Sequence, residues 1–154
     1  MPFPLIDPHE PQASRKTAWN YCSRDRGDGV QSWLTNEHRT GSGAVERSES
    51  FYIAMMFGPH RPDPQSNHDG REAAGVYAKR YMRFLSPADA EGRQVVSLTY
   101  ESDLRLDDQW IYDPRTRRTR KVIYNPYKAP GNGQLLFEDT SGFNGYIHAY
   151  EWGI

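Results

Sequence analysis

The sequence predicts a mainly β protein, a meander of curved antiparallel hairpins with one short helix. Two stretches in the second half of the chain alternate apolar and polar side chains, which is the period of a half-buried strand. No internal repeat of helical period is present. Hydrophobic residues make up 36% of the chain and aromatic residues 13%. That composition suits a sheet that keeps one face in water.

The first part of the chain is expected to contain the helix and the first strand. Prolines at positions 2, 4, 8 and 11 favour extended backbone at the start. Ser14 is then the expected cap of a short helix over Arg15–Tyr21. A strand is expected over Val30–Thr35, and the small polar residues of Thr40–Gly43 indicate a break after it.

A further strand is expected over Glu49–Phe57, because Phe51, Ile53 and Met55 recur at every second position. Gly58–Gly70 follows and contains three prolines. We expect it to form an irregular loop, and loops of this length are often functional.

The clearest hairpin joins Gly75–Leu85 to Arg93–Glu101 through the polar connection Ser86–Gly92. We interpret the apolar positions of both strands as one shared face and predict that it binds a ligand, together with two aromatic residues of the next hairpin. The predicted ligand-binding residues are Val76, Met82, Phe84, Val96, Leu98, Tyr100, Trp110 and Tyr112. The alternative is that these side chains form only the core and cross-strand packing of the sheet.

The next hairpin has its turn at Asp113–Thr116. An Asp at the first position and a Pro at the second are typical of a type I turn, because proline presets φ and the Asp side chain accepts backbone N–H bonds. A turn at these residues places Tyr112 opposite Arg117 and Trp110 opposite Thr119.

This hairpin also holds five cationic side chains within seven residues: Arg115, Arg117, Arg118, Arg120 and Lys121. Most such runs are solvated surface. The functional interpretation is a patch for anionic headgroups or an acidic partner, because the arginine fork matches phosphate oxygens. Alternation would place Arg118 and Arg120 on one face and the other three on the opposite face. The net charge of −1 argues against nucleic acid as the partner.

No motif indicates catalysis, a metal or a cofactor, so we expect a protein that is not an enzyme. His60, His68 and Asp69 share the proline-rich loop, but without the spacing of a catalytic zinc site. The single cysteine, Cys22, excludes an internal disulfide and a thiolate zinc site. An enzyme hypothesis therefore rests on that loop alone.

The chain of 154 residues fits one domain spanning 1–154. Its last strands are expected over Leu135–Phe137 and Tyr146–Trp152. The N-terminus lacks the basic and apolar regions of a signal peptide, and no apolar run is long enough to span a bilayer.

The run WIYDPRTRRTR, residues 110–120, resembles the signature W-[VI]-Y-x-P-x-x-R-R-x-R of a family of Gram-negative outer-membrane lipoprotein-sorting proteins grouped with the LolA and LolB carriers. Two further groups of segments are similar to that family in order and spacing. They are Pro2–Pro4 with Thr17–Asn20, and Phe137–Asp139 with Phe143–Gly145 and Tyr150–Trp152. Ala149 and Glu151 depart from the family's Arg and Asp.

The resemblance implies an incomplete, half-open antiparallel barrel with a helical lid, of LolA/LolB type. It implies that the concave face holds a lipid or lipoprotein acyl chain. It also implies a location in the periplasm or at the inner face of the outer membrane, and a membrane-associated transport partner. Members of that family are longer and carry an export signal, so this chain resembles a fragment of a longer domain of that type.

Two hypotheses about function follow. The first is non-catalytic binding of a hydrophobic ligand in an open β cleft, as in lipoprotein sorting or lipid transport. The alternative is an interaction or assembly module, including a homodimer, that pairs through an exposed strand edge at Tyr146–Ile154.

Overall fold

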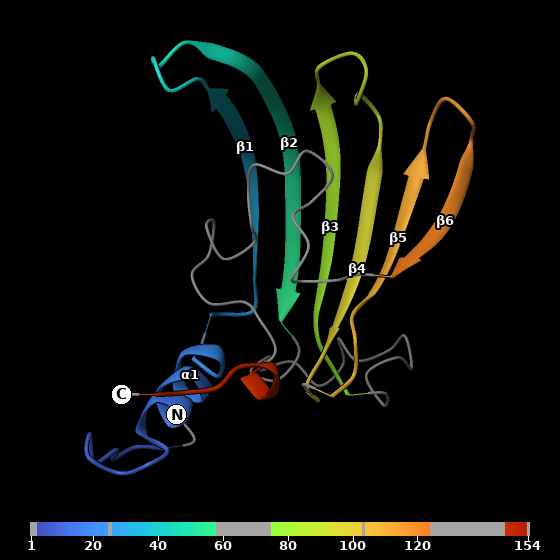
Figure 1. The fold of residues 1–154 in the computed structure, drawn as a ribbon. Coiled ribbons are helices and arrows are strands. Elements are labelled where there is room, and N and C mark those ends of the chain that lie inside the picture. Colours follow the sequence, from blue (N-terminus) through green and yellow to red (C-terminus); the bar gives the residue numbers. More distant parts are fainter. Residues whose placement is uncertain (1–2, 25, 58–74, 103, 124–146, 154) are drawn as a thin grey trace. The chain divides into compact units, whose positions relative to one another are not determined.

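Six antiparallel strands form one open sheet, in which each strand pairs with its neighbours in the sequence (Figure 1). The computed structural model describes residues 3–24, 26–57, 75–102, 104–123 and 147–153. The strands are β1 Gly29–Arg39, β2 Val45–Phe57, β3 Val76–Ser86, β4 Gln94–Tyr100, β5 Asp108–Asp113 and β6 Arg118–Ile123. They bend along their length, so the sheet is curved (Figure 1). The predicted mainly β fold is confirmed, and its open curved sheet is consistent with a half-barrel.

The chain divides into two compact units. One contains the sheet and is built from residues 26–101 and 107–124. The other is built from residues 1–25, 102–106 and 125–154, and it contains helix α1, Ala13–Cys22, and the short 3-10 helix η3, Ile147–Ala149. The single domain over residues 1–154 stays a prediction.

The predicted helix is confirmed, but its predicted cap is wrong. Helix α1 begins at Ala13, and Gln12 precedes it without a side-chain capping bond. Ser14 lies inside the helix, and its hydroxyl donates to the backbone oxygen of Gly153 (2.9 Å). The helix starts early because the turn before it already supplies an acceptor: the Ala13 N–H donates to the Glu10 carbonyl (3.1 Å).

The predicted strand over Tyr146–Trp152 is wrong for the described residues 147–153. Ile147–Ala149 forms a 3-10 turn, and the Trp152 indole N–H donates to the Ile147 carbonyl (2.8 Å). A local side-chain bond therefore satisfies backbone that a strand would have paired with a neighbour. The predicted loop Gly58–Gly70 and the predicted strand Leu135–Phe137 lie outside the described residues.

The first hairpin is longer than predicted. Strand β1 continues to Arg39, four residues past the predicted end, and β2 begins at Val45 rather than Glu49. The break at Thr40–Gly43 is confirmed, and the two strands pair on either side of it. Gly43 adopts a φ of +88°, which only glycine adopts without strain.

The register of the β5–β6 hairpin differs from the prediction by two residues. Asp113 pairs with Arg118, so Tyr112 lies opposite Thr119 and not Arg117. The loop is longer than a four-residue type I turn because Arg117 takes a left-handed conformation, with a φ of +53°, before the chain returns. The predicted role of Asp113 is confirmed, since its carboxylate accepts the N–H of Arg115 (2.9 Å).

Candidate ligand-binding faces of the sheet

The register divides the sheet into two faces, because directly opposed residues of an antiparallel pair share a face. We name them after one member each. The Phe51 face comprises Val30, Ser32, Leu34, Phe51, Ile53, Met55, Phe57, Ala78, Arg80, Met82, Phe84, Val95, Ser97, Thr99, Gln109, Ile111, Arg118, Arg120 and Val122. The Trp110 face comprises Trp33, Tyr52, Ala54, Met56, Lys79, Tyr81, Arg83, Gln94, Val96, Leu98, Asp108, Trp110, Tyr112, Thr119 and Lys121.

The predicted ligand-binding residues do not share one face. Met82 pairs with Val95, whereas Val96 pairs with Tyr81. Met82 and Phe84 therefore belong to the Phe51 face, and Val96, Leu98, Trp110 and Tyr112 belong to the Trp110 face. The assumption of a single apolar face is wrong, because the sequence does not fix which residue of β4 stands opposite which residue of β3. An offset of one residue reverses every side chain of a strand.

Val76 and Tyr100 oppose each other beyond an irregularity in the β3–β4 ladder. Both side chains are buried, and the Tyr100 hydroxyl donates to a carboxylate oxygen of Asp108 (2.7 Å). In the sheet unit these two residues are core. The binding role of each predicted residue stays a prediction.

The Phe51 face carries a row of apolar side chains across the sheet. Consecutive cross-strand partners in this row are Ser32, Ile53, Met82, Val95, Ile111 and Arg120. Phe51 and Phe84 extend it, with ring centroids 5.9 Å apart. Phe51 and Phe57 are buried, whereas the four central members of the row are only half-buried. This face thus has buried aromatic side chains at Phe51 and Phe57, and partly exposed apolar side chains in the central row.

Val95 and Ile111 on this face were missed by the sequence interpretation. Both lie in strands whose sequence shows an apolar pattern, so the sequence did mark them as strand residues. Assigning them to the face of Phe51 and Ile53, however, requires the register of three strand pairs, β2–β3, β3–β4 and β4–β5. Two polar side chains near them, Ser97 and Gln109, are bonded to each other. Ser97 is 5% exposed, and its hydroxyl accepts the side-chain N–H of Gln109 (3.1 Å).

The Trp110 face consists of amphipathic side chains. The rings of Trp33 and Tyr52 lie 5.3 Å apart, and those of Tyr52 and Tyr81 lie 6.3 Å apart. The Tyr81 hydroxyl donates to the side-chain oxygen of Gln94 (3.1 Å). Trp33 is 72% exposed. Such side chains cover apolar area while their polar tips reach water or a partner.

Lys121 belongs to this second face and is held there. Its ammonium pairs with Asp108 and lies 5.4 Å from the ring centroid of Trp110. The other members of the predicted basic patch are placed differently. Arg118 and Arg120 lie on the Phe51 face, as alternation predicted, while Arg115 and Arg117 lie in the β5–β6 turn. All five are exposed, but they do not form one surface.

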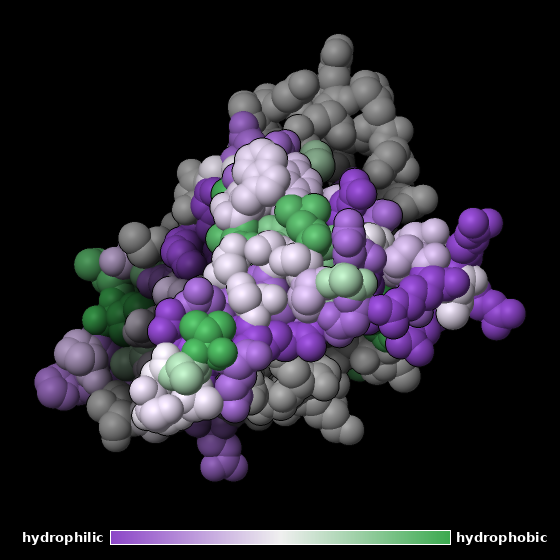
Figure 2. Space-filling model, turned by 90° about the horizontal axis from the view of Figure 1, so that it is seen from above, coloured by the Kyte–Doolittle hydropathy of each residue, from purple (hydrophilic) through white to green (hydrophobic). Residues whose placement is uncertain are grey.

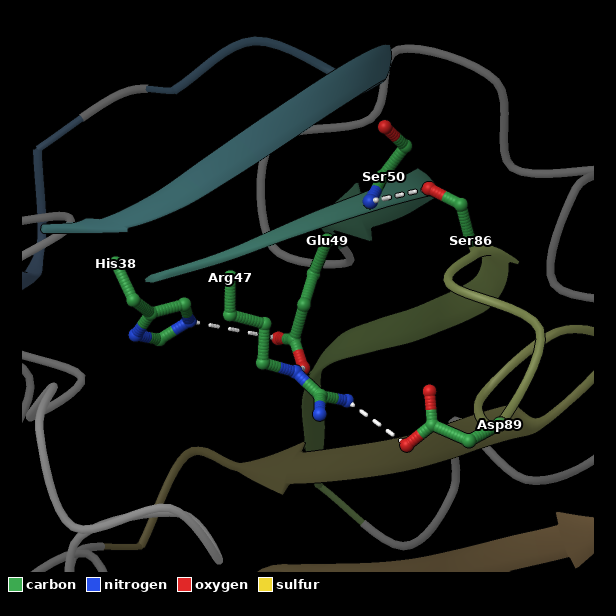
Figure 3. A network of polar contacts seen from close by, with 6 residues as sticks. All are labelled: His38, Arg47, Glu49, Ser50, Ser86 and Asp89. Atoms are coloured by element: carbon green, nitrogen blue, oxygen red, sulfur yellow. Dashed lines mark hydrogen bonds and ion pairs between the residues drawn. The ribbon is translucent and has the colours of Figure 1, made fainter. Parts of the chain in front are cut away.

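A polar network occupies the hairpin end of the sheet (Figure 3). Glu49 receives the Arg47 Nε–H on one oxygen (2.7 Å), and its other oxygen lies 3.7 Å from Nε2 of His38. Arg47 also donates to Asp89 (3.1 Å), which lies in the β3–β4 connection. Nearby, the backbone N–H of Ser50 donates to the Ser86 hydroxyl (3.2 Å). The network therefore ties β1, β2 and the β3–β4 connection together.

The hydrogen bond to Glu49 raises the pKa of the Arg47 guanidinium. The hydrogen bond from Arg47 lowers the pKa of the Asp89 carboxyl, and the charge of Arg115 adds to this. Both directions follow from stabilisation of the charged forms.

Seen from the hairpin end, the surface is mainly hydrophilic with small hydrophobic patches (Figure 2). Within the described ranges, no group of three His, Cys, Asp or Glu side chains is placed to hold a metal ion.

The described part of the chain has no helix of the length and apolarity that crossing a membrane requires. No curated protein matches the sequence. The model of the family described as "Protein of unknown function (DUF1329)" matches residues 1–154.

Two solved structures share the fold. A DUF1329 family protein from Desulfovibrio piger is 18% identical, with a TM-score of 0.54, over 88% of this chain and 50% of that one. A domain from Vibrio parahaemolyticus, provisionally named an outer membrane lipoprotein-sorting protein domain, is 20% identical, with a TM-score of 0.56, over 87% of this chain and 49% of that one. The chain thus spans about half the length of the solved structures it matches.

Proposed function

The chain belongs to the DUF1329 family, and from that premise we propose that its Phe51 face binds the acyl chain of a lipid or lipoprotein without catalysing a reaction. The observation that carries the proposal is the half-buried row Ile53, Met82, Val95 and Ile111, which crosses four neighbouring strands of a curved, open sheet. A curved sheet lined in this way is a suitable wall for a long hydrocarbon chain.

The energetics favour such a ligand. Each methylene removed from water contributes about 0.8 kcal/mol, so a chain of a dozen or so methylenes offsets the cost of association. Met55 and Met82 strengthen the case, because the unbranched thioether side chain adapts to ligands of different shape. The opposite face offers hydroxyl, ammonium and carboxylate groups, which a hydrocarbon chain would have to desolvate.

The polar groups of the Phe51 face fit binding better than chemistry. Ser97 and Gln109 bond to each other, and Thr99 donates to Asp107 (2.8 Å). These hydrogen bonds satisfy the polar groups within the sheet unit, so the groups have a structural role that requires no reaction. The name of the Vibrio parahaemolyticus domain supports a role in outer-membrane lipoprotein sorting. The LolA/LolB type, and a location in the periplasm or at the inner face of the outer membrane, are the part of this proposal that rests on the resemblance of residues 110–120.

Two adjacent valines provide a matched test. Val95 lies on the Phe51 face and Val96 on the Trp110 face, so the same substitution can be made on either side of one strand. A fluorescent fatty-acyl probe is titrated into delipidated wild type and into the V95Q and V96Q variants. We expect Val95→Gln to raise the probe Kd about tenfold, which corresponds to about 1.4 kcal/mol, and Val96→Gln to leave it within twofold.

The thermal unfolding midpoint of each variant shows whether it is folded. Wild-type protein that is folded but shows no saturable probe binding would refute the proposal. Equal weakening by both variants would refute the assignment to the Phe51 face.

A second candidate function is assembly through the β1 edge. Among the strands that the structure describes, β1 lies at an edge of the sheet, and it exposes Trp33 (72%), Val30 (46%) and Leu34 (43%). Open, apolar strand edges recruit other strands. This hypothesis predicts a concentration-dependent dimer in sedimentation that Trp33→Lys weakens. A monomer at high concentration would remove it.

A further inference from the structure

At the tip of the β5–β6 hairpin, an arginine adopts a conformation that elsewhere in the described part of the chain is found only at glycine. Arg117 is the one non-glycine residue with a positive φ (+53°) in the described ranges. The other left-handed positions there are Gly27, Gly43, Gly75 and Gly92. A side chain in this conformation is strained, and glycine relieves the strain. Stability alone therefore does not explain an arginine at this position.

The tip also concentrates charge. Arg115, Arg117 and Arg118 are exposed, and none of the three forms an ion pair with a described carboxylate. Asp113, at the start of the turn, directs its carboxylate to the Arg115 backbone N–H. The charge of Arg115 reaches Asp89, but only as a minor contribution beside that of Arg47. Lys121, by contrast, is engaged by Asp108 and Trp110.

We infer that this tip, Arg115, Arg117 and Arg118, docks the protein on a bilayer surface that carries anionic phosphate headgroups. The arginine fork forms paired hydrogen bonds with phosphate oxygens. Hot spots of protein interfaces combine arginine with tryptophan and tyrosine in well-packed, desolvated pockets. Residues 114–118 are Pro-Arg-Thr-Arg-Arg and offer arginine without an aromatic residue, so an anionic membrane surface suits the tip better than a protein partner does. Docking by the tip is independent of acyl binding on the Phe51 face.

The test uses flotation of the full chain with two kinds of vesicle. One is phosphatidylcholine alone, and the other replaces a third of it with phosphatidylglycerol. We expect wild type to float only with the anionic vesicles and to be released by salt, as for any exposed charge interaction. Each tip arginine near such a surface should contribute about fivefold to the partition coefficient. The triple variant R115Q/R117G/R118Q should therefore lose about a hundredfold.

Arg117→Gly separates binding from folding. It removes one charge and relieves the left-handed strain, so we expect weaker flotation together with an unchanged or higher unfolding midpoint. Arg117→Lys keeps the charge and should keep most of the binding. Arg83→Ala, an exposed charge removed from the Trp110 face, is the matched control and should bind as wild type does.

Three results would overturn the inference: equal flotation with both vesicle types, wild-type flotation of the triple variant, or an equal loss in Arg83→Ala. Wild type that ignores both vesicles but binds polyglutamate would also overturn it, and would identify an acidic protein as the partner. None of these results bears on the acyl-probe titration, so the two proposals fail separately.

Discussion

The Phe51 face and the Trp110 face are built by the same six strands, yet their side chains differ in kind. Adjacent residues show the contrast directly: Met55 and Val95 lie on the Phe51 face, and Met56 and Val96 lie on the Trp110 face. Met55 and Val95 are half-buried, whereas Met56 is 44% exposed and Val96 is 40% exposed. On the Phe51 face, Ile53, Met82, Val95 and Ile111 are consecutive cross-strand partners, although Met55 pairs with Arg80 and Ile111 also pairs with Arg120. The Trp110 face surrounds its aliphatic residues with tyrosine hydroxyls, ion pairs and amides.

The difference shows that hydrophobic content alone does not identify a binding surface in this sheet. Trp110, Tyr81 and Tyr52 are large, but each is suited to a boundary with water. Met56 and Val96 are more exposed, but Met56 pairs with Lys79, and Val96 pairs with Tyr81 and Trp110, so no aliphatic row continues across the strands there. The continuity of the row Ile53, Met82, Val95 and Ile111 is the physical reason for assigning the ligand to the Phe51 face.

The largest expected effect is on the stability of the Phe51 face. Phe51 is 7% exposed and packs on Phe84, so Phe51→Ala should lower the free energy of unfolding by about 3 kcal/mol or more. Trp33→Ala removes a larger but 72% exposed side chain from the other face and should cost about 0.5 kcal/mol. Urea denaturation of both variants measures the difference. Equal costs would show that the two faces are equally packed.

An intermediate effect is expected on the Trp110 face, where stability rests on polar contacts. Asp108 accepts the Tyr100 hydroxyl and pairs with Lys121. Asp108→Ala leaves the buried Tyr100 hydroxyl without this acceptor and should cost about 1–2 kcal/mol in urea denaturation. Lys121→Met keeps that bond and should cost less, because the ammonium is exposed. A cost for Lys121→Met as large as that for Asp108→Ala would contradict this order.

The smallest effect is expected in the polar network at the hairpin end of the sheet. Arg47 lowers the pKa of Asp89, so this carboxylate adds stability above its unfolded-state pKa of about 3.9. That stability is lost as the pH falls through the lowered folded-state value. Asp89→Asn should therefore be slightly less stable than wild type near about pH 6 and equal to it near about pH 2. A difference that persists in acid would exclude the ion pair as its cause.

The sequence predicted most of the strands and both clear hairpins, because alternation and turn residues are local signals. It underestimated β1 and β2, since Asn36–Arg39 and Val45–Ser48 are mostly polar, and their pairing is decided by the neighbouring strand rather than by their own pattern. It also misassigned Tyr150–Trp152, whose aromatic alternation serves a local turn closed by the Trp152 indole.

The site was less predictable than the fold. Alternation revealed which residues of one strand share a face, so Phe51, Ile53 and Met55 were grouped correctly. It could not reveal which face of β4 joins which face of β3, because the ladder contains an irregularity between Val76 and Ala78. Register between strands is a non-local property, and the predicted ligand-binding residues were divided by that single unknown.

Methionine methyl NMR can locate an acyl ligand on one face of the sheet. Met55 and Met82 are on that face, whereas Met56, next in sequence to Met55, is on the other. A fatty acid with a spin label on its chain is titrated into protein with 13C-labelled methionine methyl groups. We predict strong broadening of the Met55 and Met82 signals and little change at Met56, because paramagnetic broadening falls steeply with distance. Broadening of Met56 equal to or greater than that of Met55 would show that the acyl chain does not lie on the Phe51 face.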